Sequence, residues 1–142
     1  RTPFARWQYE GRLVVIDRAG VVITADQLDR YRSLPLVVGV DVASEAVLLI
    51  DMMATDSDLQ SRVAAAVRIG SRRWNLKLDN GVDVLLPEGG AAAAWKRLGA
   101  LHRQNKVLLR DINVIDLRVE DRVFLKLPPE TSIQIRDPGE ST

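Results

Sequence analysis

Residues 73–86 read RWNLKLDNGVDVLL and carry the clearest secondary-structure signal of the chain. Apolar side chains alternate with polar ones on both sides of an Asn-Gly pair, which predicts two antiparallel strands joined by a tight turn. Loops of two and of three residues are both compatible with this turn. Only the three-residue loop, at 79–81, places Leu76 opposite Val84 and keeps both apolar rows on one face. We therefore predict that register, with Gly81 at a positive φ angle.

The same alternation predicts further strands before and after this hairpin. They lie at Phe4–Tyr9, Arg12–Ile16, Val21–Thr24 and Leu34–Gly39, and in a final hairpin at 115–119 and Arg122–Leu127 with a turn at 120–122. Apolar residues at spacings of three and four predict two main helices, at Asp41–Ala54 and Ala91–Gln104. Hairpins interrupted by helices predict an α+β domain, with a mainly antiparallel sheet and the two helices packed on it.

Some local assignments carry their own physical reason. Asp41 is expected to cap the first helix, and residues 55–58 are expected to end it and to cap one more turn. Residues 62–69 fit either a helix, because of their alanines, or a strand, because a hairpin follows them.

Composition excludes several classes of protein. The 142 residues are 46% apolar and 27% charged, as in an ordinary globular domain, and a net charge of +1 argues against a dedicated nucleic-acid binder. The absence of cysteine excludes disulfides, thiolate catalysis and Cys-based metal sites. No apolar run approaches the roughly 18 residues of a membrane-spanning helix. Because the sequence starts at Arg1 and not at Met, we expect a fragment or a processed product.

The sequence offers no convincing catalytic group. It lacks a phosphate-binding loop and a His-x-x-x-His pair, and its single histidine, His102, is expected to be a packed or half-exposed helix residue and not a ligand. Asp79 and Asp83 flank a turn, but turn chemistry explains Asp79 and the solvent face of a strand explains Asp83 better than a catalytic carboxylate pair does. We therefore predict no catalytic, cofactor or metal site. A small hydrolase domain and a nucleic-acid-binding module remain the alternatives, the latter because of the basic residues at 68–77.

The final hairpin gives the strongest indication of a binding surface. If the apolar row that includes Ile115, Val119 and Leu125 faces the core, then Phe124 is exposed among charged residues. Arg122–Leu127 is also the last confident strand, so we expect an edge to which another chain can add a strand. Its lysine and the following prolines are equally typical of a protected edge, and residues 131–135 alternate so that they fit a strand that covers it.

Several pieces of sequence, taken together, resemble the extracytoplasmic part of the FtsQ/DivIB family of bacterial cell division proteins. The most specific combination is a Trp-x-Leu-x-Leu-x-x-Gly pattern followed later by Asp-Leu-Arg. The pieces are Pro3–Trp7, the turn 17–20, Arg72–Val82, Val84–Pro87, 96–98 and Val114–Arg118.

The resemblance implies a division of the chain into residues 1–8, the end of a POTRA domain, residues 9–129, the family's β domain, and a tail at 130–142. It implies a non-enzymatic scaffold without a cofactor, located in the periplasm and anchored in the full-length protein by one transmembrane helix. It also implies FtsB and FtsL as partners at the division septum, with FtsB adding a strand to the last edge strand.

The resemblance carries over to a set of partner-binding residues. Arg118 matches the arginine of the family's late Asp-Leu-Arg motif, and Arg72 and Arg73 lie near the arginines that precede its tryptophan hairpin. Val119 stands where some members have an aromatic residue, so we expect Phe124 to supply the apolar anchor. The complete predicted set is Arg72, Arg73, Arg118, Val119, Arg122, Val123, Phe124, Leu125, Lys126 and Leu127.

Overall fold

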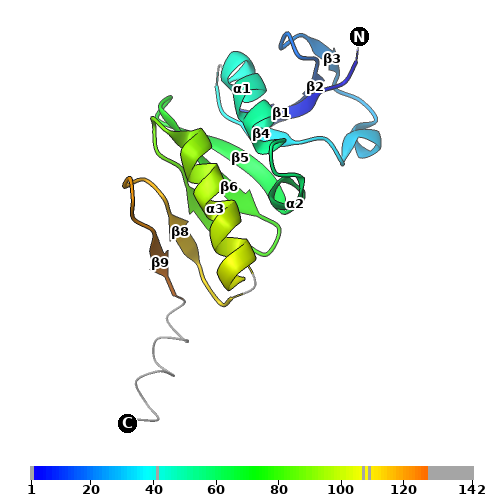
Figure 1. Ribbon diagram of the computed structural model, residues 1–142. Coiled ribbons are helices and arrows are strands. Elements are labelled where there is room, and N and C mark those ends of the chain that lie inside the picture. The colour runs from blue at the N-terminus through cyan, green and yellow to red at the C-terminus, as the bar shows by residue number, and fades with distance from the viewer. Residues whose placement is uncertain (1, 41, 107, 109, 128–142) are drawn as a thin grey trace, which may run out of the picture.

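The computed structural model describes residues 2–40, 42–106, 108 and 110–127 (Figure 1). Within these residues, nine strands form one sheet in the order β3-β2-β1-β4-β5-β6-β7-β8-β9. The strands are β1 (Ala5–Tyr9), β2 (Arg12–Ile16), β3 (Val22–Thr24), β4 (Leu36–Val38), β5 (Val63–Ile69), β6 (Arg73–Leu78), β7 (Asp83–Leu85), β8 (Val114–Asp116) and β9 (Phe124–Lys126). The helices are α1 (Ala43–Met53), α2 (Ser57–Ser61) and α3 (Ala91–Asn105), with a 3₁₀ turn η1 (Leu28–Tyr31).

The predicted α+β class is confirmed, but the sheet is more mixed than the prediction. Five of the eight strand pairings are antiparallel, whereas β1–β4, β4–β5 and β7–β8 are parallel. Parallel neighbours need a long crossover connection. For β4–β5 the connection contains α1 and α2, and for β7–β8 it contains α3. Hairpin patterns reveal only antiparallel neighbours, so they do not predict these pairs.

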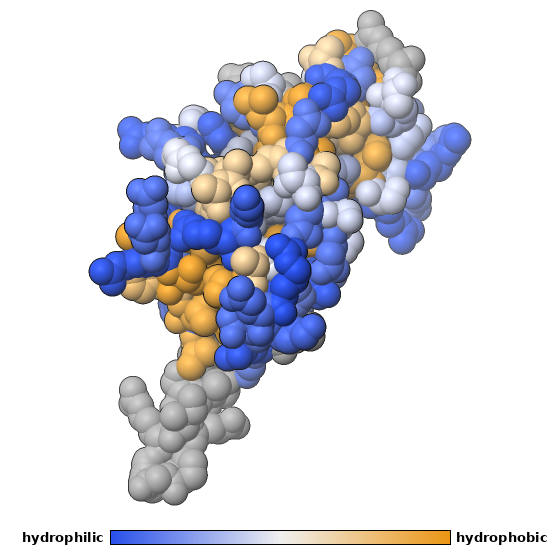
Figure 2. Space-filling model, viewed as in Figure 1, coloured by the Kyte–Doolittle hydropathy of each residue, from blue (hydrophilic) through white to orange (hydrophobic). Residues whose placement is uncertain are grey.

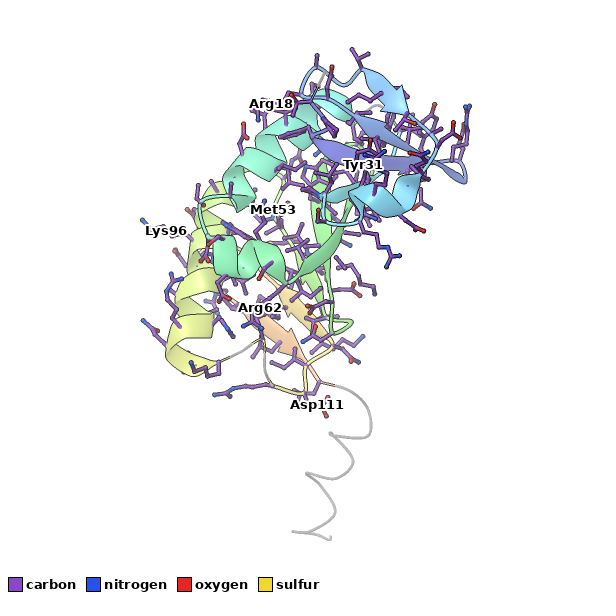
Figure 3. The ribbon with its side chains drawn as sticks, turned by 90° about the vertical axis from the view of Figure 1, so that its right-hand side faces the viewer. Arg18, Tyr31, Met53, Arg62, Lys96 and Asp111 are labelled. Atoms are coloured by element: carbon purple, nitrogen blue, oxygen red, sulfur yellow. The ribbon has the colours of Figure 1, made fainter. Side chains whose placement is uncertain are left out.

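The α-helices pack on one face of the sheet, as the two views in Figure 1 and Figure 3 show. The core lies between this face and the helices. Leu76, Val84 and Ile115 are neighbours across β6, β7 and β8, and all three are fully buried. Trp95 and Leu98 of α3 are buried in the same apolar cluster. None of the helices in the described ranges is long and apolar enough to span a lipid bilayer.

The β6–β7 hairpin has the predicted register. Leu76 lies opposite Val84, and the N–H of Leu78 donates to the carbonyl oxygen of Val82 at 2.9 Å. Gly81 has a φ angle of 91°, and its N–H donates to the carbonyl of Leu78 at 3.0 Å. Burial of one apolar row therefore selects the loop length, as the alternation of the sequence indicates.

Replacing Gly81 with valine is expected to lower the free energy of unfolding by about 1–3 kcal/mol, because a β-branched residue is strained at a positive φ angle. A Cβ atom added at Gly81 would meet no other atom within 4 Å, so strain and not a clash is the cause. The measurement is urea unfolding. Gly89→Ala is the control, because a Cβ atom there also meets open space and the φ angle is ordinary. Equal stability of Gly81→Val and the unmodified chain would contradict the prediction.

The ambiguous segment at 62–69 forms β5. Its central residue Ala66 is buried between Val37 of β4 and Leu76 of β6, so pairing on both sides overrides the helical preference of alanine. The cap predicted within residues 55–58 is Asp56, whose carboxylate accepts the N–H of Leu59 at 3.2 Å at the start of α2. The N-cap of α1 is Val42, without a side-chain hydrogen bond. Asp41, the predicted cap, lies outside the described residues.

One junction of the sheet is short. β4 pairs with β5 only at Val37↔Ala66 and Val38↔Val67, although β5 has seven residues. The first residues of β5 therefore pair with β6 alone, and a bulge at Ala64 interrupts that register too. We call this junction the β4–β5 seam. It joins β3-β2-β1-β4 to β5–β9 within one sheet. The predicted boundary at residue 8 falls inside β1, and both it and the boundary at residue 129 stay predictions.

Candidate functional site

Among the residues that the structure describes, the last strand, β9, lies at an edge of the sheet and pairs with β8 alone. It covers Phe124–Lys126 and is shorter than the predicted strand at 122–127. All three of its residues are exposed. The competing prediction, that 131–135 covers this edge, falls on residues outside those that the structure describes.

The backbone of β9 has a defined direction at this edge. The carbonyl oxygen of Lys126 accepts the N–H of Asn113 at 2.8 Å, so the polar groups of Lys126 point toward β8. The N–H and C=O groups of one residue in a strand point to the same side, and those of the next residue point to the other. Phe124 therefore points its N–H toward β8, whereas Leu125 directs its N–H and C=O outward, where a further strand can pair.

The side chains of β9 leave apolar surface exposed. Phe124 lies opposite Asp116 on the open face and is 51% exposed, as the alternation predicts. Leu125 lies opposite the buried Ile115, but it is 45% exposed. Leu125 thus lies on the predicted face of the sheet, but the expected burial of Leu125 and Leu127 is wrong, because the apolar cluster stops short of this edge. Figure 2 shows apolar surface along this margin, beside the place where the described chain ends.

The turn between β8 and β9 holds three more predicted residues. Val119 is 46% exposed, so its predicted place on the buried face is wrong, because β8 ends at Asp116. Arg122 is exposed, and its carbonyl accepts a hydrogen bond from the Arg97 guanidinium of α3 at 3.3 Å. Val123 is partly buried against the core. The turn is thus held by α3 while Val119 and Arg122 remain accessible.

Arg118 is engaged within its own chain. Its Nε donates to Oδ1 of Asp116 at 3.0 Å and its Nη2 donates to Oδ2 at 2.8 Å, a two-point ion pair. The backbone N–H of Arg118 also donates to Asp116 Oδ1 at 3.0 Å. Sequence reasoning missed this pair, although the Asp-x-Arg spacing is a signal for it. A guanidinium has five N–H donors, so Arg118 retains donors for a partner.

The pKa of the Asp116 carboxyl is lowered, first by hydrogen bonding to the Arg118 side chain, while partial burial opposes the shift. The nearby charge of Arg73 adds a smaller lowering effect. Because the folded-state pKa lies below the unfolded value of about 3.9, the carboxylate stabilises the fold above about pH 4, and this stabilisation is lost as the pH falls through the folded-state pKa.

At neutral pH, the Asp116→Asn variant is therefore expected to have a lower free energy of unfolding than the unmodified chain. Between about pH 4 and pH 2 it should lose less of that free energy than the unmodified chain does. Urea unfolding at a series of pH values measures this slope. Arg118→Gln removes the partner and should reduce the loss of unfolding free energy below about pH 4 in the same way. If both variants lose as much stability on acidification as the unmodified chain, the pair contributes nothing to folding.

The other predicted arginines lie at the same end of the sheet. Arg73 begins β6, and its effect on Asp116 places it near the Arg118 pair. Its Nε is buried without a hydrogen-bond partner among the described residues. Arg72 is exposed in the turn before β6. One region beside the β9 edge therefore contains Arg73, the Asp116–Arg118 pair and Phe124. Arg72 lies next to Arg73, at the margin of this region.

The basic cluster at 68–77 does not form one patch. The guanidinium of Arg68 lies over the Trp74 ring, 5.0 Å from its centre, and Trp74 belongs to the helix-covered core. Lys77 pairs with Asp83 on the opposite face of the sheet, with 3.0 Å between Nζ and Oδ1. This division weakens the nucleic-acid alternative, which needs a continuous basic surface.

His102 is buried in α3, as its place beside the apolar row predicts. Its Nδ1 accepts the N–H of Leu108 at 3.4 Å, and burial lowers its pKa, which favours the neutral ring. Its contacts are those of a packed structural residue.

Comparison with known proteins identifies a family to which this chain is similar. A family model described as cell division protein FtsQ/DivIB, C-terminal, matches residues 5–118, and this match ends before β9. A protein named cell division protein FtsQ from Rhizobium meliloti (strain 1021) is 41% identical over 130 residues, which cover 92% of this chain and 42% of that protein. A protein of the same name from Caulobacter vibrioides (strain NA1000 / CB15N) is 36% identical over 126 residues, 89% of this chain and 42% of that protein. The chain thus spans about two fifths of the length of these relatives.

Proposed function

Because this chain belongs to the FtsQ/DivIB family of cell division proteins, we propose that it is the partner-binding part of a division scaffold and that β9 captures a strand of FtsB. The proposed scaffold is non-enzymatic. It lies in the periplasm at the division septum, is anchored in the inner membrane by one helix of the full-length protein, and holds FtsB and FtsL within the septal machinery that builds peptidoglycan.

The observation that carries this proposal is the outward backbone edge of β9. An unpaired edge strand offers main-chain hydrogen bonds that fix the register of an added strand, and neighbouring side chains then supply specificity. Phe124 and Leu125 supply exposed apolar surface on the two faces of this edge. The charges of Arg72, Arg73 and Arg118 favour an acidic partner segment, through faster association and a dependence on salt.

Phe124→Ala tests the apolar anchor. An aromatic residue that becomes desolvated at an interface often contributes about 2 kcal/mol, so the variant should bind FtsB about thirtyfold more weakly. The fold should persist, because Phe124 lies outside the apolar core. Binding is measured by calorimetric titration with the periplasmic part of FtsB in complex with FtsL.

The control for this prediction is Val22→Ala. Val22 is a 50% exposed apolar residue of β3, the strand at the other end of the sheet. It should bind the FtsB–FtsL complex like the unmodified chain. If Phe124→Ala and Val22→Ala bind equally well, Phe124 is not the anchor.

A further inference from the structure

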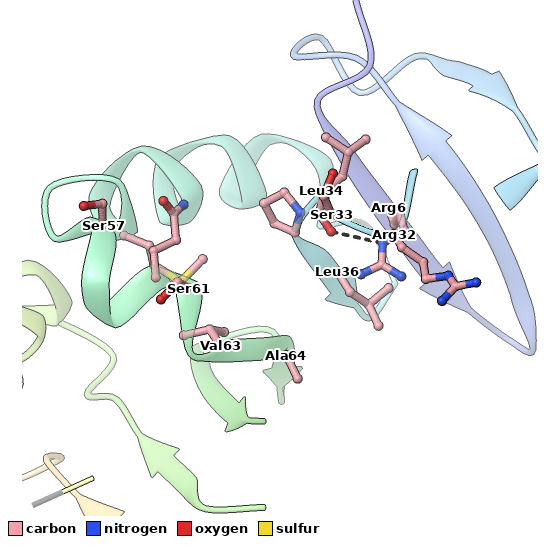
Figure 4. Close-up of a pocket in the computed structure, with 12 residues that line it drawn as sticks. Arg6, Arg32, Ser33, Leu34, Leu36, Ser57, Ser61, Val63 and Ala64 are labelled. Atoms are coloured by element: carbon pink, nitrogen blue, oxygen red, sulfur yellow. Dashed lines mark hydrogen bonds between the residues drawn. The ribbon is translucent and has the colours of Figure 1, made fainter. Parts of the chain in front are cut away.

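A pocket of about 630 Å³ opens at the β4–β5 seam, away from the β9 edge (Figure 4). Its wall is formed by β1, the connection from η1 to β4, the segment from α1 to α2, and the start of β5. Its polar lining comes from Arg6, Arg32, Ser33, Ser57, Gln60 and Ser61. We call it the seam pocket.

The seam pocket is positively charged. Its wall contains two guanidinium groups and no carboxylate. Arg6 donates from Nε to the carbonyl oxygen of Leu34 at 3.0 Å, which fixes the guanidinium while its terminal nitrogens remain for a ligand. Burial lowers the pKa of Arg6, and within the described residues it has no ion-pair partner. Arg32 meets Asp29 only at 3.6 Å, and both side chains are largely exposed.

The start of β5 beside the pocket pairs with β6 but has no partner strand on its β4 side among the described residues. Val63 and Ala64 line the pocket, and β4 does not pair with this part of β5. Ala64 is the extra residue of the bulge, and a bulge turns a strand and exposes its polar groups. The small alanine side chains leave room along this part of β5.

We propose that the seam pocket binds an extended peptide segment that carries a carboxylate. Arginine forks match carboxylates in a two-point geometry, and hydroxyl groups add donors around them. A segment that lies along the open, β4-facing side of the start of β5 gains main-chain hydrogen bonds, as in other strand additions. This site is separate from β9 and does not depend on FtsB binding there.

The direct test titrates the chain with the peptide acetyl-Thr-Val-Glu-Val-Thr-amide and with its Glu→Gln counterpart, and follows backbone amide shifts by NMR. The expected result is that the glutamate peptide binds about tenfold more tightly and shifts the amides of Ser33, Leu36 and Ala64. Equal affinities, or shifts elsewhere, would overturn the proposal. Inorganic phosphate serves as a second probe, and the proposal also fails if phosphate shifts these amides while the glutamate peptide does not.

Variants locate the binding in the pocket. Arg6→Gln and Arg32→Gln should each remove the preference for glutamate, whereas Arg12→Gln, at an exposed position of β2, should retain it. Ala64→Leu fills the space and should block both peptides, while Ala92→Leu on exposed α3 surface should not. Arg32 is exposed, so its variant keeps the test valid if Arg6→Gln unfolds. Unchanged binding by folded Arg32→Gln and Ala64→Leu variants would overturn the proposal.

Discussion

If β9 captures a strand of FtsB as proposed, replacing Leu125 with proline is expected to abolish this binding while the domain stays folded. Leu125 directs its N–H away from β8, so proline removes no hydrogen bond inside the sheet but removes a donor to the added strand. The ring also obstructs the approach of that strand. We expect affinity to fall by about a hundredfold or more, which corresponds to ~3 kcal/mol. Calorimetric titration with the FtsB–FtsL complex measures the loss.

Two matched variants separate the backbone from the side chain. Leu125→Ala keeps the N–H group and should lose less than about tenfold in affinity. Phe124→Pro removes an N–H that points toward β8, so it should lower the melting temperature, whereas Leu125→Pro should not. A folded Leu125→Pro variant that binds FtsB with unchanged affinity would rule out strand addition at β9.

Trp95→Ala should have the largest effect on stability. Trp95 is 1% exposed and is among the largest fully buried side chains of the described chain. Truncation of such a residue leaves a cavity and costs about 3–5 kcal/mol of unfolding free energy. Urea unfolding measures the change.

Trp95→Phe is the control for this cavity. The indole Nε1 is buried without a hydrogen-bond partner within the described residues, so phenylalanine removes a polar group that gains nothing there. It should therefore cost much less than alanine. Equal losses for Trp95→Phe and Trp95→Ala would show that Nε1 has a partner, such as an ordered water molecule.

The sequence predicts those features that depend on neighbouring residues in the chain. Alternation around Gly81 is sufficient to predict the pairing of Leu76 with Val84, because any other register would expose an apolar row. Likewise Asp56 is recognisable as a cap, since its carboxylate reaches a backbone N–H only three residues later. Exposure of Phe124 follows from its parity within β9.

Features that depend on distant segments are not predictable in this way. No local pattern shows that Val37 and Ala66 pair in parallel, because a helical crossover separates them in the chain. The exposure of Leu125 depends on how far the core extends, and not on alternation. The seam pocket brings Arg6 and Arg32 together with residues of α2, so only the folded chain reveals it.

The β4–β5 seam also determines how the sheet carries mechanical load. β9 lies at one end of the strand order, and the N-terminal strands β1 to β3 lie at the other. If a partner pulls on β9 while the N-terminal side is held, the force runs across the strands, so it tends to open hydrogen-bond ladders one after another. The seam carries only two paired positions, Val37↔Ala66 and Val38↔Val67, although α1 and α2 also connect its two sides. Of the ladders between β1 and β9, the seam has the fewest paired positions, so under tension between these two strands we expect this ladder to open first.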